Sequence, residues 1–346
     1  MLKVKSLQIK GFETVVVGKD PSSDFHGIIA VHSTQLGPSL GGIRMWPYRN
    51  EKEGLQDVLR LATAMTKKAA ISGLPMGGGK AVIIGDPAKD KTRDLLLSMG
   101  EFIESLHGKY IAAKDSGILP EDLDIVSEQT RHVTGTTKKQ GGSGDPSFAT
   151  AKGVLAGMRA ACQFVFGTKS LKGRVVAIQG IGQVGWNVGN LLSLQGAQLI
   201  VADPLSSRVK RAQESWKASV VPLARIHQVP ADIFAPCALG GILNADTIPQ
   251  LRASIVAGGA NNQFLDEKKD PYLLMKRSIL HVPDYVLNAG GLINLFVREI
   301  LHQRRLAPWM LNIEHTVQQV LAASLQEQLP PLVVANRMAL QKLKVP

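Results

Sequence analysis

The sequence of 346 residues contains only two cysteines, Cys162 and Cys237, which lie far apart in apolar surroundings. A disulfide framework is therefore not expected, and two buried thiols in a reducing compartment are the favoured interpretation. The chain lacks an apolar run of membrane-spanning length, and its first residues do not form a signal peptide. These absences predict a cytoplasmic protein with no membrane partner.

Several catalytic and metal-binding sequence motifs are also missing. The eight histidines show neither H-E-x-x-H nor H-x-H spacing, so no metal site is predicted. No G-x-S-x-G element of a hydrolase occurs. The run Pro75–Lys80 is rich in glycine, but a phosphate loop would need glycine at position 74 and a hydroxyl at 81, where the chain has Leu74 and Ala81. A Walker-type nucleotide site is thereby rejected.

The formal net charge is +12, which would raise the local concentration of anions, including nucleotides. The basic residues are nevertheless scattered as short pairs among acidic and apolar residues, without a basic tail or an aromatic-studded basic stripe. A solvated surface is the favoured interpretation, and nucleic acid is not expected as a partner.

What the sequence does contain is an apolar, β-branched stretch from Arg174 that runs into G-x-G-x-x-G. Gly180 allows a tight turn, Gly182 lets the backbone approach a pyrophosphate, and Gly185 lets the following helix pack closely. Asp203 ends the next apolar stretch, eighteen residues after Gly185, where a carboxylate would bind the ribose hydroxyls and repel a 2′-phosphate. The predicted cofactor is NAD, and this motif contributes Gly180, Ile181, Gly182, Gln183, Val184, Gly185 and Asp203.

The position of this motif predicts two α/β domains, because the residues before it must form a second unit. We expect a substrate-binding and oligomerisation domain over residues 1–135 and a Rossmann-type NAD-binding domain over residues 136–330, with a cleft between them. Residues 331–346 are predicted to return to the first domain. A linker without large apolar residues is expected over Thr134–Ser147.

Hydrophobic periodicity predicts the elements in outline. Strands are expected at Phe12–Val17, Gly27–His32, Ala81–Ile84, Tyr110–Ala113, Ala231–Ala235, Ser254–Ala257 and Tyr285–Leu287. Helices are expected from Glu53 to Lys68 and over Leu95–Leu106, Glu121–Glu128, Thr150–Phe164, Met310–Gln326 and Pro331–Leu343. The turns at 236–238, 258–262 and 288–291 follow strands of the second domain, and they are predicted to line one cleft.

Three polar residues of the first domain are candidates for chemistry. Lys80 follows three glycines, so its amine is expected in a poorly solvated place, where a lysine can act as a base near neutral pH. Lys68 ends the preceding helix and could bind a carboxylate. Asp115 follows a strand, which is a common place for a functional acid, although a turn aspartate is an equal alternative.

The motifs Leu36–Met45, Met65–Ala70, Pro75–Lys80, Ala235–Gly240, Ala260–Gln263 and Pro283–Gly291 together resemble the amino-acid dehydrogenases of the leucine, phenylalanine and valine type, relatives of glutamate dehydrogenase. The resemblance covers roughly residues 10 to 300, and its pattern is most like leucine dehydrogenase. It implies oxidative deamination of an L-amino acid by NAD to a 2-oxo acid and ammonia, in a homo-oligomer.

The resemblance also implies roles for matching positions. Lys68 would bind the substrate carboxylate, helped by the backbone at Gly41 and Gly42; Lys80 would activate water; and Asp115 would exchange protons with the substrate nitrogen. Asn262 would orient the substrate. The residues implied to contact NAD outside the glycine motif are Thr150, Cys237, Ala238 and Asn261.

The resemblance places the substrate side chain among Leu40, Ala113, Leu292 and Leu295. All four are apolar, so a charged side chain would lack a partner, and leucine, valine or isoleucine is favoured over phenylalanine or tryptophan. Lys114 departs from the family pattern and is expected to act on the protonation of Asp115 or Lys80. A catalytically silent NAD-binding protein is the alternative from another class.

Overall fold

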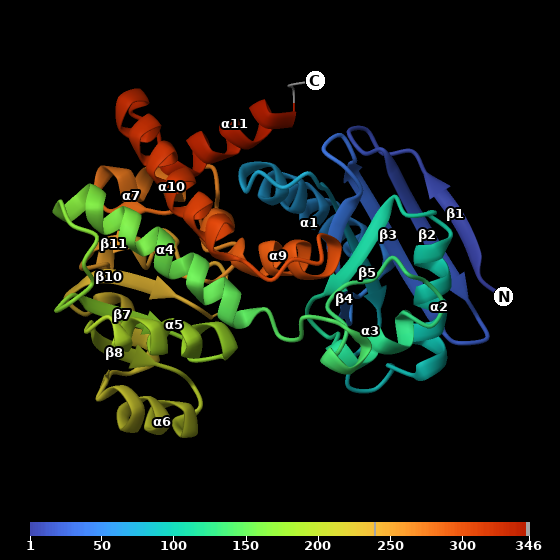
Figure 1. The fold of residues 1–346 in the computed structure, drawn as a ribbon, viewed down its shortest axis with the longest axis horizontal. Helices are drawn as coiled ribbons and strands as arrows, with labels where there is room; N and C mark the ends of the chain where they lie inside the picture. Colours follow the sequence, from blue (N-terminus) through green and yellow to red (C-terminus); the bar gives the residue numbers. More distant parts are fainter. Residues whose placement is uncertain (239, 344–346) are drawn as a thin grey trace. The chain divides into compact units, whose positions relative to one another are not determined.

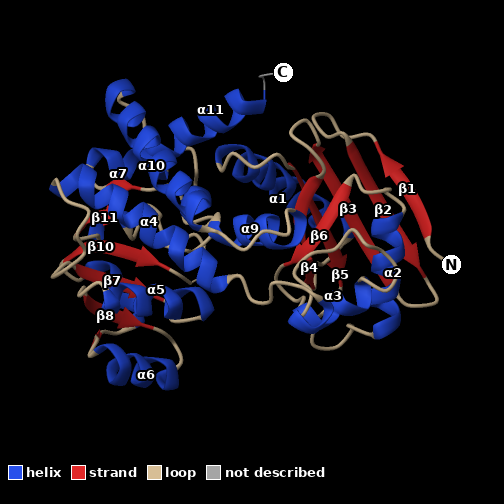
Figure 2. Ribbon diagram, viewed as in Figure 1, coloured by secondary structure: helices blue, strands red, loops and turns tan. Residues whose placement is uncertain are grey.

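The computed structural model describes residues 1–238 and 240–343, which form two compact units. The first unit comprises Met1–Asp145, Leu295–Arg304 and the described residues from Ala339 on. The second comprises Pro146–Asn294 and Arg305–Met338. Each unit is a β-sheet with helices packed against it (Figures 1 and 2). No helix in the described part of the chain is long and apolar enough to cross a membrane.

The sheet of the first unit has the strand order β1-β2-β3-β5-β4-β6. Its strands are β1 (Lys3–Leu7), β2 (Thr14–Asp20), β3 (Phe25–Ser33), β4 (Ser39–Trp46), β5 (Gly77–Ile84) and β6 (Tyr110–Lys114). The neighbours β1, β2, β3 and β5 pair antiparallel. Strand β4 lies between β5 and β6 and runs parallel to both. The carboxyl ends of β4, β5 and β6 therefore lie at the same edge of this sheet.

Alternate residues of these strands face two separate layers of helix, as the two-residue period of a strand requires. Val15 and Val17 belong to the apolar cluster that contains α1 (Glu51–Ile71). Val16 belongs to the cluster on the other face, which contains α2 (Arg93–Glu104) and α3 (Pro120–Val126). Helix α1 thus covers one face, and α2 and α3 cover the other.

Helix α1 is fixed at both ends. The Asn50 side chain caps its start by accepting the N–H of Glu53 at 2.9 Å, and Glu51 and Glu53 suit the positive end of the helix dipole. Near its end Thr66 packs on Gly78 of β5, where any side chain would collide with the Thr66 backbone. Gly78 therefore lets the end of α1 lie directly on the strand that carries Lys80.

The sheet of the second unit is entirely parallel, with the order β12-β11-β10-β7-β8-β9. Its strands are β7 (Val175–Gln179), β8 (Gln198–Ala202), β9 (Ser219–Val220), β10 (Ala231–Pro236), β11 (Ala253–Val256) and β12 (Leu280–His281). This is the order of dinucleotide-binding sheets, in which the connections reverse direction between β7 and β10. The Rossmann-type fold predicted from the glycine motif is confirmed.

The helices of the second unit are α4 (Ser147–Phe166), α5 (Gln183–Leu194), α6 (Ser206–Trp216), α7 (Asp270–Lys276), α8 (Asp284–Leu287), α9 (Gly290–Leu295), α10 (Ala307–Glu327) and α11 (Pro331–Leu343). The last residues of α9 and α11 belong to the first unit. In Figure 1, α4 and α5 lie against the sheet that contains β7 and β10.

The strand predicted at Tyr285–Leu287 is wrong, because these residues form helix α8. Pro283 accepts the N–H groups of Val286 and Leu287 at 3.1 and 3.2 Å, and Asp284 accepts that of Asn288. The edge strand is instead the two-residue β12, which pairs with β11. A run of four residues does not distinguish a buried strand from a short helix, which is why periodicity failed here.

The boundary of the first unit differs from the predicted position 135. Residues up to Asp145 belong to it, together with Leu295–Arg304. The carboxylate of Glu299, in the π-helical turn η4 (Phe296–Ile300), accepts the N–H of Gly135 at 2.6 Å and that of Ser143 at 2.8 Å. These bonds tie the expected linker to a segment that lies more than 150 residues later in the chain.

The end of the chain returns to the first unit later than position 331. Residues up to Met338 of α11 belong to the second unit, and only those from Ala339 belong to the first. The Lys342 Nζ donates a hydrogen bond to the Ile71 carbonyl at 3.2 Å, beside the end of α1. The final residues 344–346 of the predicted segment lie outside the described residues.

Candidate active site

The candidate site of the first unit is centred on an ion pair between Lys80 and Asp115. The Lys80 Nζ lies 2.5 Å from the Asp115 Oδ2, and the two side chains are 7% and 22% exposed. Lys80 lies in the middle of β5, and Asp115 directly follows β6. The lysine side chain therefore has to cross β4, which lies between these two strands.

Gly42 of β4 leaves the space for this crossing. A Cβ at this position would lie 2.6 Å from the Asp115 Cβ and 3.1 Å from the Lys80 Nζ. The backbone around it is fixed by Tyr110, whose hydroxyl donates to the carbonyls of Gly41 at 2.7 Å and Gly42 at 3.2 Å. Gly41 has its own reason to lack a side chain, because a Cβ there would collide with the Gly79 carbonyl.

The structure adds Arg44, to which the sequence analysis assigned no role. Its Nε lies 3.2 Å from the Asp115 Oδ2, and its Nη1 lies 3.0 Å from the Asp57 Oδ2 on α1. Asp57 also accepts hydrogen bonds from Tyr48 at 2.7 Å and Arg60 at 2.8 Å. Arg44 therefore connects the Lys80–Asp115 pair to a second carboxylate on the covering helix.

A signal for Arg44 was present in the sequence. It is a single charged residue in the strand Ser39–Trp46, whose other residues are apolar, small or aromatic. Because buried arginines are almost always paired with an acid, such a residue predicts a carboxylate partner. The identity of that partner depends on contacts between distant segments, which no local pattern contains.

The charges around Asp115 keep it ionised. Burial alone would raise the pKa of this carboxyl, but the positive charges of Lys80 and Arg44, with hydrogen bonds from Lys80 and the Ser116 backbone, lower the pKa to about 2. Burial likewise opposes the charge on Arg44, yet Asp115 and Asp57 raise its pKa overall. Asp115 is thus a carboxylate at neutral pH, able to accept a hydrogen bond from an ammonium group.

The other predicted substrate residues are distributed over both units. Leu40 and Ala113 are buried in the neighbouring strands β4 and β6, where Gly42 is paired with Ala113. Lys68 lies in the last turn of α1. Leu295, 8% exposed, belongs to the first unit, and Leu292 to the second. The structure groups Leu40 and Ala113 with the Lys80–Asp115 pair, while Leu292 remains a prediction from the resemblance.

The glycine-rich loop of the second unit has the geometry of a phosphate-binding turn. Gly180 has a φ of +90°, a conformation that strongly favours glycine. No atom outside its chain neighbours lies within 4 Å of a Cβ built at Gly182, so this side of the loop is open among the described residues. Helix α5 begins at Gln183 and turns its first N–H groups toward that opening. These residues fit the pyrophosphate of a dinucleotide.

Asp203 lies at the end of β8, but it is more engaged than expected. Its carboxylate accepts the N–H of Ile181 at 2.7 Å and that of Leu205 at 2.9 Å, and its side chain is only 2% exposed. The Arg208 Nη1 lies 3.6 Å away. Asp203 therefore holds the glycine-rich loop in place.

The turns predicted to line one site do converge within the second unit. A Cβ at Gly180 would lie 2.8 Å from the Ala238 Cβ, and one at Gly185 would lie 3.2 Å from the Cys237 Cβ. The Asn288 Nδ2 donates a hydrogen bond to the Asn261 Oδ1 at 2.7 Å, which joins the turn at 258–262 to the turn at 288–291.

Two further predicted residues lie around these turns. Thr150 of α4 lies beside Gly291, where a Cβ would be 2.7 Å from the threonine Oγ1. Asn262 has a φ of +51°, a conformation that asparagine tolerates better than most residues. The predicted cofactor residues of the turns are thus neighbours around the carboxyl ends of the strands.

Comparisons with known proteins agree with this arrangement. A family model described as "Glu/Leu/Phe/Val dehydrogenase, dimerisation domain" matches residues 12–137, and one described as "Glutamate/Leucine/Phenylalanine/Valine dehydrogenase" matches residues 204–309. Leucine dehydrogenase of Geobacillus stearothermophilus is 45% identical over 343 residues, which cover 98% of this chain and 93% of that protein. The chain belongs to the glutamate, leucine, phenylalanine and valine dehydrogenase family.

Membership of this family makes the protein an amino-acid dehydrogenase, an oxidoreductase of a kind that typically uses a nicotinamide cofactor. Its similar relatives differ in substrate. Phenylalanine dehydrogenase of Thermoactinomyces intermedius is 41% identical, with 96% of this chain and 92% of that protein covered. The crystal structure of L-tryptophan dehydrogenase from Nostoc punctiforme superposes with a TM-score of 0.84 at 39% identity, covering 96% of both chains.

Proposed function

We propose that the protein catalyses the NAD-dependent oxidative deamination of an apolar L-amino acid, with leucine and other branched-chain amino acids favoured. The amino acid, NAD and water give the 2-oxo acid, ammonium, NADH and one proton. The observation that carries the proposal is the buried Lys80–Asp115 pair at 2.5 Å, in a chain of an amino-acid dehydrogenase family.

Each polar group of the first unit has a task in this reaction. Lys68 binds the substrate carboxylate, beside the backbone of Gly41 and Gly42. The Asp115 carboxylate accepts a hydrogen bond from the amino group, since its pKa of about 2 keeps it ionised at neutral pH. In this proposal it also exchanges a proton with that nitrogen during the reaction. After the hydride leaves the α-carbon, Lys80 in its unprotonated form removes a proton from the water that attacks the imine and becomes the ammonium.

Arg44 is a positioning residue in this proposal. It approaches Asp115 from the side of α1, while Lys80 crosses β4 to the same Oδ2 atom. Two cations on one oxygen hold the carboxylate in one orientation. The other oxygen, Oδ1, accepts a long hydrogen bond of 3.4 Å from the Ser116 hydroxyl, and in this proposal it also accepts one from the substrate nitrogen. Orienting a reacting group in this way contributes to catalysis without direct contact with the substrate.

The second unit binds the cofactor, which accepts the hydride when bound. The open side of Gly182 and the start of α5 hold the pyrophosphate. In this proposal Asp203 also accepts a ribose hydroxyl, which favours NAD over NADP. The residues Thr150, Cys237, Ala238 and Asn261 contact the cofactor in this proposal, and Asn262 orients the amino acid.

Four apolar residues, Leu40, Ala113, Leu292 and Leu295, form the pocket for the amino-acid side chain in this proposal. A carboxylate such as that of glutamate would lose its hydration there without gaining a partner. Phenylalanine or tryptophan is the second candidate substrate, favoured by the similarity to the phenylalanine and L-tryptophan dehydrogenases.

We also propose a homo-oligomer, supported by the match of residues 12–137 to a model described as a dimerisation domain. The two cysteines, Cys162 and Cys237, carry free thiols, which suits a reducing compartment such as the cytoplasm.

The experiment is an activity profile of the purified protein with NAD and leucine, valine, isoleucine, phenylalanine, tryptophan and glutamate, followed by NADH absorbance. The highest kcat/KM is expected for a branched-chain substrate. A profile led by phenylalanine or tryptophan would replace the proposed substrate, and a profile led by glutamate would contradict the apolar pocket. Repeating the assay with NADP tests the choice of cofactor.

A further inference from the structure

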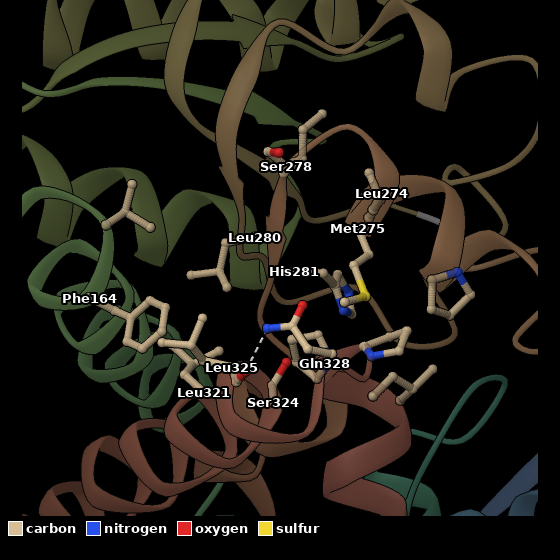
Figure 3. Close-up of a pocket in the computed structure, with 16 residues that line it drawn as sticks. Phe164, Leu274, Met275, Ser278, Leu280, His281, Leu321, Ser324, Leu325 and Gln328 are labelled. Carbon is tan, nitrogen blue, oxygen red and sulfur yellow. Dashed lines mark hydrogen bonds between the residues drawn. The ribbon is translucent and has the colours of Figure 1, made fainter.

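The second unit contains a cavity that none of the residues assigned above lines. It is bounded by the ends of α4 and α10, by α7, by β12 and by the start of α11, and its volume is about 380 Å³ (Figure 3). Sites for small molecules usually have volumes of about 300–1,000 Å³. This cavity, called the α7–α10 cavity below, is therefore large enough for a small organic molecule.

The wall of the α7–α10 cavity is mainly apolar and carries no acidic or strongly basic side chain. None of its 16 lining residues is Asp, Glu, Lys or Arg, although the chain as a whole has a net charge of +12. The lining residues Leu274 and Leu321 are each 1% exposed, whereas Phe164 and Leu325 are 42% and 61% exposed. The cavity thus runs from an exposed apolar rim to a buried apolar floor, where a charged ligand would lose its hydration without a counterion.

The wall includes four polar side chains, those of Ser278, Ser324, Gln328 and His281. Three of them are partly or fully exposed, whereas the fourth, His281, is buried and only 3% exposed. Its Nε2 lies 3.3 Å from the Gln263 Oε1. The Gln263 Nε2 donates to the carbonyls of Gly258 and Ala260, so Oε1 is the acceptor and the proton of the imidazole is assigned to Nε2. Burial lowers the pKa of His281 to about 3, so that the ring is neutral at physiological pH.

The remaining ring nitrogen, Nδ1, is therefore an acceptor. It is buried and has no hydrogen-bond partner among residues 1–238 and 240–343. A buried acceptor without a donor is energetically costly, and such groups are rare in folded proteins. Met275 lines the same cavity. Its unbranched side chain can adapt when a ligand brings a donor to Nδ1.

We propose that the α7–α10 cavity binds a neutral, mainly apolar small molecule that carries one N–H or O–H group, which donates a hydrogen bond to the His281 Nδ1. The apolar body of the ligand covers the leucines of the floor, and the rim at Phe164 and Leu325 closes over it. This proposal is independent of the proposed substrate and cofactor, because none of the cavity's lining residues is assigned to the substrate or cofactor site.

Occupation of the cavity has a structural consequence for α11. Pro331 and Leu332 at the start of this helix line the cavity, and the same helix continues into the first unit from Ala339. A ligand therefore packs against the beginning of an element that the two units share. We expect binding to raise the melting temperature of the protein, since the ligand binds only the folded chain.

The test uses indole and 1-methylindole, two neutral rings of nearly the same size that differ in the N–H donor. Isothermal titration should show that indole binds about tenfold more tightly to the unmodified protein, because 1-methylindole leaves Nδ1 unpaired. His281→Phe keeps an aromatic ring but removes the acceptor, so the two probes should bind this variant equally. Equal binding to the unmodified protein, or no binding of either probe, would overturn the proposal.

A second pair of variants locates the binding. Leu325→Trp places a larger side chain at the rim and should weaken both probes at least about tenfold by filling the space they need. Leu311→Trp is the matched control: it lies on the same helix, is 65% exposed and does not line the cavity, so it should bind the probes normally. If indole bound at the amino-acid site instead, neither substitution would weaken its binding. That result would refute binding in the cavity even if the His281→Phe variant failed to fold.

Discussion

Removing Asp115 from the Lys80–Asp115 pair should destabilise the protein more than removing Lys80. The pKa of Asp115 is lowered from 3.8 to about 2 in the folded state. At about 1.4 kcal/mol per unit, this shift corresponds to roughly 2.5 kcal/mol of stabilisation of the ionised carboxylate, which Lys80 and Arg44 supply together.

The two single variants should differ because the pair is asymmetric. Asp115→Asn leaves the buried ammonium of Lys80 without its carboxylate partner and close to the positive charge of Arg44. We expect the free energy of unfolding to fall by about 3–5 kcal/mol. Lys80→Met leaves Asp115 paired with Arg44 at 3.2 Å, so the expected loss is smaller, about 1–2 kcal/mol. The double variant should cost less than the sum of the two by about 2 kcal/mol.

Urea unfolding followed by circular dichroism measures these free energies. All samples need the same protein concentration, because the stability of an oligomer depends on it. If the two substitutions added within about 0.5 kcal/mol, the ion pair would not make the contribution assigned to it.

The pH dependence provides a second check on the same pair. The folded-state pKa of Asp115 lies below its ordinary value of 3.8, so its stabilisation is present above about pH 4 and is lost as the pH falls through about 2. The stability difference between the unmodified protein and Asp115→Asn should therefore narrow over this range. A constant difference would refute the assigned pKa shift.

The remaining predictions concern catalysis and cofactor binding. Lys80→Ala should lower kcat about a hundredfold or more while the Kd for NADH, measured by its fluorescence, stays unchanged; a nearly normal rate would exclude Lys80 as the base. Asp57→Asn should loosen Arg44 and lower kcat more than it changes KM, with Asp57→Glu restoring part of the rate; an unchanged kcat would contradict the positioning role of Arg44. Asp203→Asn can accept only one of the two N–H groups that the carboxylate now accepts, so the Kd for NADH should rise about tenfold with little change in kcat at saturation; unaltered NADH binding would show that Asp203 has no role toward the cofactor.

Features whose cause is local were predictable from the sequence. The left-handed conformation of Gly180 and the start of α5 follow from the spacing of the glycines, because a tight turn and a close helix need residues without side chains at those positions. Lys80 could be selected because it follows three glycines, and glycines let backbone segments pack closely. The parallel second sheet followed from the same motif.

Features whose cause is a distant contact were missed. Arg44 has its role only because β4 lies next to β6 and its side chain faces α1, so that its guanidinium reaches both Asp115 and Asp57. An influence on Asp115 was expected from its chain neighbour Lys114, whereas the charges that lower the pKa of Asp115 are those of Lys80 and Arg44. Adjacent residues of a strand point to opposite faces, so a neighbour in sequence is a poor guide to a neighbour in space.

The segment around Glu299 is a second feature that depends on a distant contact. Its carboxylate accepts hydrogen bonds from Gly135 and Ser143, and no local sequence pattern predicts these contacts. A glycine-rich stretch without large apolar residues resembles a free linker when it is considered alone. Its position is set by an acid from a later part of the chain.

Neither unit is one continuous piece of polypeptide, and this has a consequence for any attempt to exchange them between relatives. The chain passes from one unit to the other after Asp145, Asn294, Arg304 and Met338. A chimera joined only at the first of these points would place an N-terminal half from one parent against a Glu299 segment and a chain end from the other. Grafting a nucleotide-binding half onto a new substrate half therefore needs four matched junctions, and recombination at a single crossover should give poorly folded hybrids.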